Sequence, residues 1–316
     1  MIPSEGAGKP VRAAHRARTW WRGDLAWQLR HSPVMMGAGA VLAVAVLGAL
    51  FAPWLAPHNP FDLATLNLSD ALAPPRWLDG GNPAYPLGTD DQGRDLLSAI
   101  MYGARISLFV GIASVALAMI VGVALGLVAG YVGGKLDAFI MRVADVQLSF
   151  PAILIALLID GVLRTALPHD ARAATALAVL VIAIAASNWV QYARSVRGST
   201  MVEKTREYVQ AARVIGIAPL AIMRRHLLPN VLGPVLVLAT INIATAIITE
   251  ATLSFLGVGL PVTEPSLGTL IRIGNDFLFS GEWWITIFPG AALVIMVLSI
   301  NLVGDGLRDA LDPKLR

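Results

Sequence analysis

Cysteine is absent from the 316 residues of this chain, and histidine occurs only five times. The lack of cysteine excludes disulfides, thiol nucleophiles and metal sites with cysteine ligands. No two histidines have the spacing that would place them on one helix face, so no metal site is expected. The sequence also lacks an HExxH motif, a pair of carboxylates suited to acid–base catalysis and a nucleophile–base constellation. We therefore assign no catalytic residues.

Charged residues are scarce as well. They make up 14% of the chain, whereas a soluble domain normally carries about 25%. Hydrophobic residues account for 56%, and the mean hydropathy is +0.67. The apolar residues form blocks that are long enough to cross a bilayer, which takes about 20 helical residues. We therefore expect an all-α polytopic membrane protein in contact with lipid, and not a nucleic-acid-binding protein.

Six membrane-spanning helices are expected from these blocks. The first block follows a polar lead and is longer than the apolar region of a signal peptide, so we interpret it as a span. The expected spans are Val34–Phe51, Ile106–Tyr131, Ala138–Ile159, Ala173–Val190, Val231–Leu253 and Ile285–Val303.

The distribution of Lys and Arg predicts how the spans are oriented. If both termini lie inside the cell, eighteen of the 24 Lys and Arg residues lie on that side, as the positive-inside rule requires. The chain then divides into a cytoplasmic segment 1–33, a first span 34–51, an external loop 52–103, a five-helix core 104–304 and a cytoplasmic tail 305–316. Within the core, the basic loop 194–229 is expected in the cytoplasm.

One glycine-rich stretch superficially resembles a phosphate-binding loop. The pattern G-x-x-x-x-G-K-[ST] would align with Lys135, but Ala129 stands where the first glycine belongs and Leu136 where Ser or Thr belongs. The chain therefore lacks an ATPase site of its own, and any ATP that drives its function must be bound by another polypeptide.

The basic loop 194–229 carries several local helix signals. Thr200 and Glu203 have the spacing of a capping box, which predicts a helix start. Gly216 is expected to end that helix. Four residues have the spacing i, i+3, i+4 and i+7 and are expected on one helix face, namely Tyr208, Ala211, Ala212 and Ile215.

A second helical stretch is expected from Pro219 to Leu228, closed by Pro229 and Asn230. A short helix that lies across the membrane surface and presents small residues can dock into a groove of another protein. It can also lie on lipid as an amphipathic interfacial helix. Periodicity alone does not separate these two interpretations.

Four glycines recur at intervals of four residues along the second span, at Gly122, Gly126, Gly130 and Gly134. Such a stripe lets two helix backbones approach closely, so it predicts tight helix packing.

Two acidic residues fall at or near membrane depth. A charge at the bilayer centre costs about 2.5–3.5 kcal/mol on insertion scales, so such residues face protein or a cavity. Asp145 is expected to pair with Arg142, one turn away. Glu250 is expected either to make an inter-helix hydrogen bond or to line a translocation path or gate.

The expected external loop contains a segment of turn residues and charges, which comprises Gly88, Thr89, Asp90, Gly93, Arg94 and Asp95. These residues either offer polar groups to a partner or form a self-capping turn. In the second case Thr89 and Gln92 would start the next helix.

Gln210-Ala211-Ala212, Gly216 and Leu228-Pro229 resemble the EAA loop of ABC importer permeases, whose pattern is E-A-A-x3-G-x9-I-x-L-P. Gln210 replaces the Glu of this pattern, although Glu207 lies one turn earlier, and His226 replaces the Ile. The segment Arg225–Asn230 is typical of the dipeptide, oligopeptide and nickel branch of the family.

Further blocks resemble the C-type permease of that branch, at Pro86–Leu97, Arg142–Pro151, Glu250–Gly259 and Asn301–Pro313. The resemblance implies the fold of a type I ABC importer permease in the bacterial inner membrane. It implies a sister B-type permease, two cytoplasmic ATPases that bind ATP and Mg²⁺, and an external substrate-binding protein, with no cofactor in this chain. The solute would be a dipeptide, an oligopeptide, a nickel complex or a similar small molecule.

The resemblance also implies roles for individual residues. The EAA loop of the family forms a coupling helix that inserts into the ATPase, which assigns coupling to Glu207, Gln210, Ala211, Ala212, Gly216, Leu228 and Pro229. External loops meet the binding protein, which assigns that contact to the six residues of the segment 88–95 named above. The alternative is a proton-coupled secondary transporter that uses Glu250 or Asp145, but the sequence shows no convincing internal repeat of the kind found in such carriers.

Overall fold

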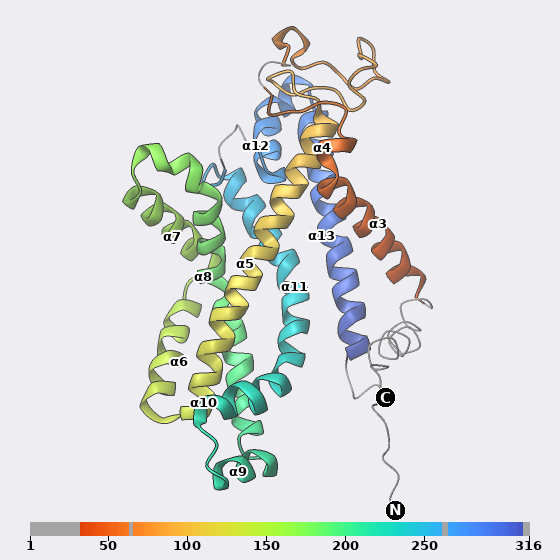
Figure 1. The fold of residues 1–316 in the computed structure, drawn as a ribbon. Helices are drawn as coiled ribbons and strands as arrows, with labels where there is room; N and C mark the ends of the chain where they lie inside the picture. The colour runs from red at the N-terminus through yellow and green to blue at the C-terminus, as the bar shows by residue number, and fades with distance from the viewer. Residues whose placement is uncertain (1–31, 63–65, 261–264, 312–316) are drawn as a thin grey trace, which may run out of the picture.

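The computed structural model describes residues 32–62, 66–260 and 265–311 of the chain. These residues form an elongated bundle of helices (Figure 1). The helical elements in chain order are α3 Pro33–Leu50, α4 Ala52–Leu55, η1 Leu68–Asp70, α5 Leu96–Val132, α6 Gly134–Leu148, α7 Ala152–Ala166, α8 His169–Glu203, α9 Glu207–Val214, α10 Pro219–Ile222, η2 Met223–Leu227, α11 Leu228–Phe255, α12 Leu267–Phe277, η3 Leu278–Ser280 and α13 Trp284–Leu311.

The apolar helices account for the expected spans. Among the described residues, five helical stretches are long and apolar enough to cross a membrane, namely α3, α5, α8, the run from α10 through α11, and α13. The pair α6 and α7 makes a sixth span when it is counted as one, although it bends by 98° at its break. The prediction of an all-α bundle with six spans is therefore confirmed, with the third span in two pieces.

The expectation that the third span is one continuous helix is wrong because of Pro151. Proline has no backbone N–H to donate, and it disfavours helical geometry in the residue before it. The end of α6 is fixed to α8 by side chains close to the break. The Gln147 amide donates to the carbonyl oxygen of Ala186 at 2.8 Å, and the Trp189 indole N–H donates to the Gln147 side-chain oxygen at 2.8 Å. Polar side chains thus supply contacts where the helix is interrupted.

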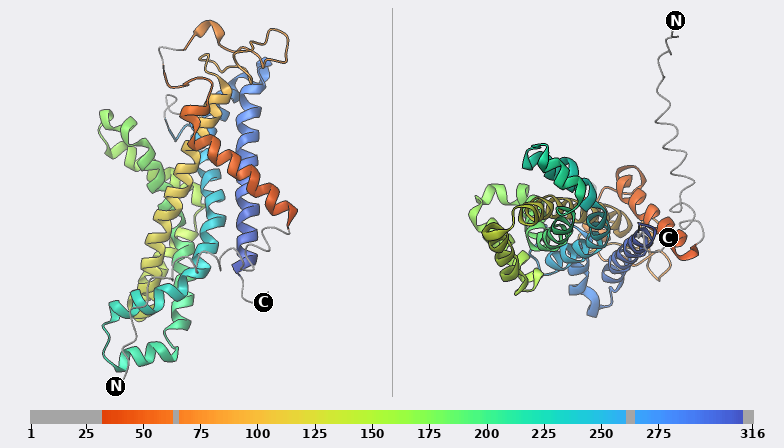
Figure 2. Two further views of the ribbon diagram at one scale, coloured as in Figure 1. Left: turned by 45° about the vertical axis from the view of Figure 1, so that its right-hand side comes forward. Right: turned by 90° about the horizontal axis from the view of Figure 1, so that it is seen from below.

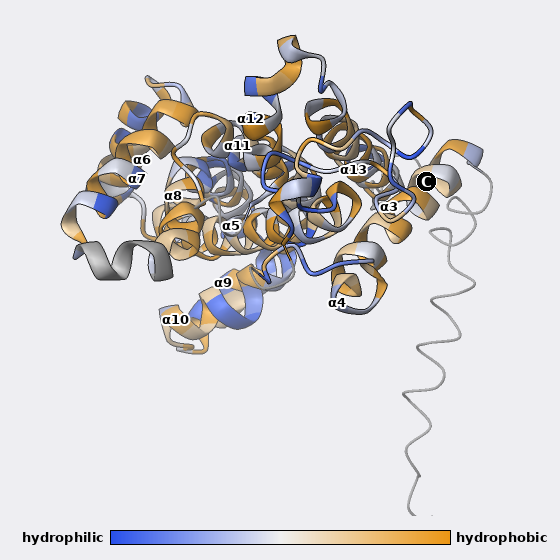
Figure 3. Ribbon diagram, turned by 90° about the horizontal axis from the view of Figure 1, so that it is seen from above, coloured by the Kyte–Doolittle hydropathy of each residue, from blue (hydrophilic) through white to orange (hydrophobic). Residues whose placement is uncertain are grey.

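The bundle has two distinct ends. Residues 56–62, residues 66–95 and α12 lie at the end that is uppermost in Figure 1, which we call the loop end. Helices α9 and α10 lie at the opposite end, which we call the α9 end. The left view in Figure 2 shows the same separation of the two ends. Figure 3, seen from the loop end, shows mostly hydrophobic helices, with hydrophilic stretches in the capping loops and in α9.

The glycine stripe of α5 packs directly against α8, which confirms the tight helix packing expected from the sequence. A Cβ atom added to Gly122 would lie 2.5 Å from the carbonyl oxygen of Trp189, and one added to Gly126 would lie 2.5 Å from that of Ala193. Gly130 is as tightly enclosed, by Arg197 and Thr200, whereas Gly134 lies beyond α5 in open space. Three glycines of the stripe therefore allow contact between the two backbones. The two helices run in the same direction, because Gly122, Gly126 and Gly130 meet Trp189, Ala193 and Arg197 in that order.

Several helix boundaries differ from those expected. Helix α5 begins at Leu96, so the last residues of the expected external loop 52–103 are helical. Helix α8 continues to Glu203. The capping-box prediction is therefore wrong, because Thr200 lies inside α8 and is buried there. Polar contacts hold the extended end of α8, since Arg197 pairs with Asp137 of α6.

The expectation that Pro229 and Asn230 close a helix is also wrong. The chain passes from α10 through the π-helical turn η2 directly into α11. Pro229 occupies the first turn of α11, directly after this π-helical turn.

We predict that Gly126→Ala destabilises the protein by about 1–3 kcal/mol, because the new methyl group meets backbone atoms of α8 that have no room to move. Gly198→Ala is the matched control, since nothing lies within 4 Å of the Cβ it adds to α8. Thermal unfolding of the purified variants in detergent measures the difference. Equal unfolding temperatures for the two variants would show that the α5–α8 contact is not tight.

Candidate functional site

Helix α9 has one face packed against the bundle and one face exposed. Val209 and Ala212 are buried, whereas Ala211 and its neighbour Gln210 are exposed. The four residues expected on one helix face, Tyr208, Ala211, Ala212 and Ile215, therefore do not form one exposed face, because Ala212 at its edge turns toward the chain's own core. A contact between α9 and another protein would involve the Ala211 side.

Gly216 ends α9 in the manner that the sequence predicted. Its φ angle is +79°, a left-handed conformation that favours glycine. The Gly216 N–H donates to the carbonyl oxygen of Arg213, and the Ile217 N–H donates to that of Ala212. These two bonds form a Schellman motif, which turns the chain sharply from α9 toward α10.

The turn places large apolar side chains in the open. Val214 is 87% exposed, Ile215 74% and Leu220 of α10 72%. A cleft of about 750 Å³ lies at the other end of α9, at the corner with α8, and is lined by Val202, Thr205, Arg206, Glu207 and Tyr208. The described part of the chain leaves this apolar ridge, Val214, Ile215 and Leu220, without a cover. An exposed apolar group rimmed by polar residues is typical of a protein contact.

Helix α9 is anchored to the rest of the α9 end by polar contacts. The Tyr208 hydroxyl donates to the Glu203 carboxylate at 2.7 Å and accepts from the Asn230 amide at 3.1 Å. Burial and then the Glu203 carboxylate raise the pKa of Tyr208. Lys204 donates to the carbonyl oxygen of Gly130 at 2.6 Å. The segment that carries the expected coupling residues of α9 is therefore fixed to the last turns of α5 and α8 and to the first turn of α11. Leu228 and Pro229, the other two expected coupling residues, lie in that first turn of α11.

At the loop end, the six residues of the segment 88–95 are all buried. The Asp90 carboxylate pairs with the Arg94 guanidinium at 2.6 Å and also accepts the backbone N–H groups of Gln92 and Arg94 at 2.9 Å. Gly88 and Gly93 have φ angles of +84° and +76°. These side chains form the interior of a compact turn, and the expectation that they are offered to a binding protein does not match their burial.

This compact turn closes the beginning of two spans. Asp95 is the N-cap of α5 and accepts the Ser98 N–H at 2.9 Å. The Trp284 indole N–H of α13 donates to the carbonyl oxygen of Thr89 at 3.2 Å. The interpretation that this segment forms a turn that caps the next helix is therefore confirmed, but the capping residue is Asp95 and not Thr89 or Gln92.

Glu250 lies fully buried where α5, α11 and α12 meet. Its two carboxylate oxygens accept hydroxyl groups of Ser107 and Ser254, each at 2.7 Å. Ser107 also accepts the backbone N–H of Leu267 at 3.4 Å. Both oxygens thus have partners within the chain, which matches the inter-helix hydrogen bond that the sequence left open for Glu250.

Two further acidic residues of the bundle are each paired with an arginine. Asp145 contacts Arg194 of α8, so the expected pair with Arg142 is wrong. Asp160 of α7 pairs with Arg164 at 2.6 Å, and Arg164 also donates to the carbonyl oxygen of Gly259 beyond α11. Sequence reasoning missed this link because its partners are far apart in the chain. No group of three or more His, Asp or Glu residues that could hold a metal ion occurs in the described segments.

We predict that Asp90→Ala destabilises the protein by about 3–5 kcal/mol, because it leaves the buried Arg94 guanidinium without its carboxylate. Asp79→Ala, at an exposed position of the same loop, is the control and should have little effect. Thermal unfolding of the purified protein measures both. If Asp90→Ala unfolds at the temperature of the control, the compact turn does not depend on this ion pair.

Comparison with known proteins identifies the family. The family model described as "Binding-protein-dependent transport system inner membrane component" matches residues 122–316, and the model of the N-terminal transmembrane domain of oligopeptide transport permease C matches residues 19–75. The dipeptide transport system permease protein DppC of Haemophilus influenzae is 43% identical over 282 residues, which cover 89% of this chain and 90% of that protein.

Other relatives agree. DppC of Escherichia coli is 44% identical, with 88% of each chain covered, and the oligopeptide transport system permease protein OppC of Bacillus subtilis is 35% identical, with 98% of this chain and 95% of that protein covered. A chain of the MetNI methionine ABC transporter, solved in inward-facing conformations, has the same fold, with a TM-score of 0.51 at 19% identity over 68% of this chain and 96% of that chain. This chain therefore belongs to the family of inner-membrane components of binding-protein-dependent transport systems.

Proposed function

We propose that this chain is one permease subunit of an ATP-driven importer of dipeptides or oligopeptides. A sister permease of the B type would complete the translocation path. The observation that carries this proposal is the near full-length similarity to peptide transport permeases, at 35–44% identity. A nickel complex or another small solute remains within the same class of importer.

We further propose that two separate ATPase subunits supply the energy and hold the ATP and Mg²⁺. The chain lacks a Walker A sequence at its one glycine-rich candidate, where Ala129 and Leu136 replace required residues. The exposed apolar ridge at Val214, Ile215 and Leu220 is suited to fill a groove in such a subunit. Gly216 and the buried Ala212 then serve the coupling contact by holding α9 in place.

The orientation that fits this role has the α9 end and both termini in the cytoplasm of a bacterial cell and the loop end outside. The excess of Lys and Arg in loop 194–229 supports this orientation. At the loop end, the buried segment 88–95 would serve as a scaffold, and exposed side chains such as Leu68, Trp77 and Phe279 would be available to the substrate-binding protein.

The contacts of Glu250 argue against proton coupling. A proton-coupled carrier needs an acid that exchanges protons with a water-filled path. Glu250 is fully buried, and both of its oxygens accept hydroxyl groups of the same chain. A structural role in joining α5 and α11 is therefore favoured, and the role in a gate stays a prediction.

We predict that Val214→Asp combined with Ile215→Asp lowers ATP-driven uptake by the assembled transporter about tenfold or more. Two exposed apolar side chains would no longer enter the ATPase groove, and burial of each is worth about 1.5–3 kcal/mol. Membrane insertion should be unchanged, because neither side chain packs inside the chain. Uptake and co-purification of the ATPase subunits are measured together.

The control for this variant is Leu136→Asp, which alters an exposed apolar residue at the same end but outside α9. It should keep most of the uptake. Normal coupling in the double variant, or an equal loss in the control, would contradict the docking role of the ridge.

Single cysteines test the orientation, since the chain has none of its own. With a membrane-impermeant maleimide, Ser69→Cys should be labelled in intact spheroplasts and Ile215→Cys only in inverted vesicles. The opposite pattern would reverse the assignment of the two ends.

A further inference from the structure

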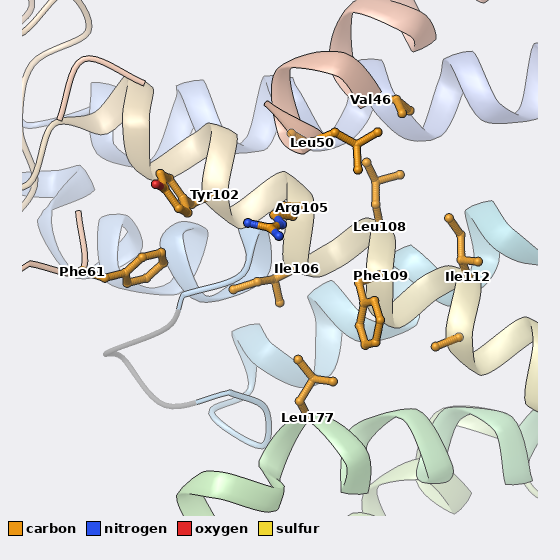
Figure 4. Close-up of a pocket in the computed structure, with 12 residues that line it drawn as sticks. Val46, Leu50, Phe61, Tyr102, Arg105, Ile106, Leu108, Phe109, Ile112 and Leu177 are labelled. Carbon is orange, nitrogen blue, oxygen red and sulfur yellow. The ribbon is translucent and has the colours of Figure 1, made fainter. Parts of the chain in front are cut away.

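An apolar groove lies between α3 and α5, and its lining includes one charged side chain. Its volume is about 920 Å³ (Figure 4). It is lined by Val46, Ala49 and Leu50 of α3, by Tyr102, Arg105, Ile106, Leu108, Phe109, Ile112 and Ala113 of α5, and by Phe61 and Leu177. The lining is almost entirely hydrocarbon, so the groove is suited to an apolar occupant.

Arg105 is the charged residue of this lining. Its side chain is exposed, and it makes no ion pair or side-chain hydrogen bond with the described residues. Figure 4 shows its guanidinium among Tyr102, Leu50 and Ile106. Phe61, which also lines the groove, packs edge-on against Tyr102, with ring centroids 5.1 Å apart. A lone cation at the mouth of an apolar groove attracts an anionic group that is attached to an apolar chain.

The position of Arg105 along α5 corresponds to the edge of the membrane. No Asp, Glu, Lys or Arg follows it in α5, from Ile106 to Val132. Helix α3 ends beside it at Leu50, and the exposed Trp54 lies just beyond that end. Aromatic residues and arginine gather at the level of lipid headgroups, and the apolar part of the groove then lies at the level of the acyl chains.

We propose that this groove binds one phospholipid. The Arg105 guanidinium would hold the phosphate by paired N–H···O bonds, and an acyl chain would lie between α3 and α5 along Val46, Phe109 and Ile112. The lipid would fill the space beside α3, whose buried residues are only Met35, Ala38 and Ala49 among those described. The proposal requires that the chain lies in a membrane. In the orientation proposed above, Arg105 lies toward the outside, so the lipid would belong to the outer leaflet.

Photolabelling of the assembled transporter tests the site. The complex is reconstituted in proteoliposomes of phosphatidylethanolamine with a phosphatidylglycerol probe that carries a diazirine in its acyl chain. After irradiation, adducts are located by peptide mass spectrometry. We expect adducts on the peptides that contain Val46 and Ile112. Arg105→Ala should lower this labelling at least about fivefold, and Ile112→Trp should lower it similarly by filling the groove. Arg76→Ala, at an exposed arginine of the loop end, should leave it unchanged.

The proposal is contradicted if the Arg105→Ala variant is photolabelled as strongly as the unaltered chain. It is also overturned if a cross-linker placed at Ile112 captures a helix of the sister permease, because a protein would then occupy the groove. ATP-driven uptake is measured in the same proteoliposomes. Uptake without specific labelling rejects the lipid site alone, whereas specific labelling without ATP-driven uptake rejects the transport function alone.

Discussion

The close contact between α5 and α8 is the constraint on which the rest of the bundle depends. Gly122, Gly126 and Gly130 bring the two backbones together over two turns of helix, and this leaves no space for a Cβ atom. At one end of this pair, Lys204 joins α8 to the last turn of α5 and fixes the start of the α9 segment. At the other end, Asp95 caps α5 within the compact turn of the loop end. The two ends are thus connected by one tightly packed pair of helices, which in the proposed transporter would carry motion from the ATPases toward the external side.

Paired charges and hydroxyl groups complete this framework, because a polar group that is buried away from water needs a partner within the protein. Asp90 has Arg94, Asp160 has Arg164, and Glu250 has Ser107 and Ser254. Each of these sets lies within the chain and fixes a loop or a helix crossing. The α9 end differs, since there the described residues leave the apolar ridge at Val214 and Ile215 uncovered. Polar groups that are paired within the chain serve to hold its fold together, whereas an exposed apolar ridge is typical of a surface that contacts another protein.

Local sequence patterns predicted the features that depend on local geometry. The apolar blocks predicted the spans, the four-residue glycine repeat predicted tight helix packing along α5 but not its partner α8, and Gly216 predicted the end of α9. The break before Ala152 was not predicted because the apolar run continues across Pro151, and hydropathy does not register a lost N–H. Burial of Ala212 and Asp90 was not predicted because it depends on remote partners, such as Trp284 for the turn that holds Thr89. The roles taken from the family resemblance therefore apply to segments more securely than to single side chains.

The energy source is the central claim of this account, and reconstitution of the lone chain tests it most directly. The purified subunit is placed in liposomes with a pH gradient, peptide and no nucleotide, and uptake is compared with that of the complete set of permeases, ATPases and binding protein supplied with ATP. The account predicts no uptake by the lone chain and ATP-dependent uptake by the complete set. Robust gradient-driven uptake by the lone chain, abolished by Glu250→Gln, would contradict it.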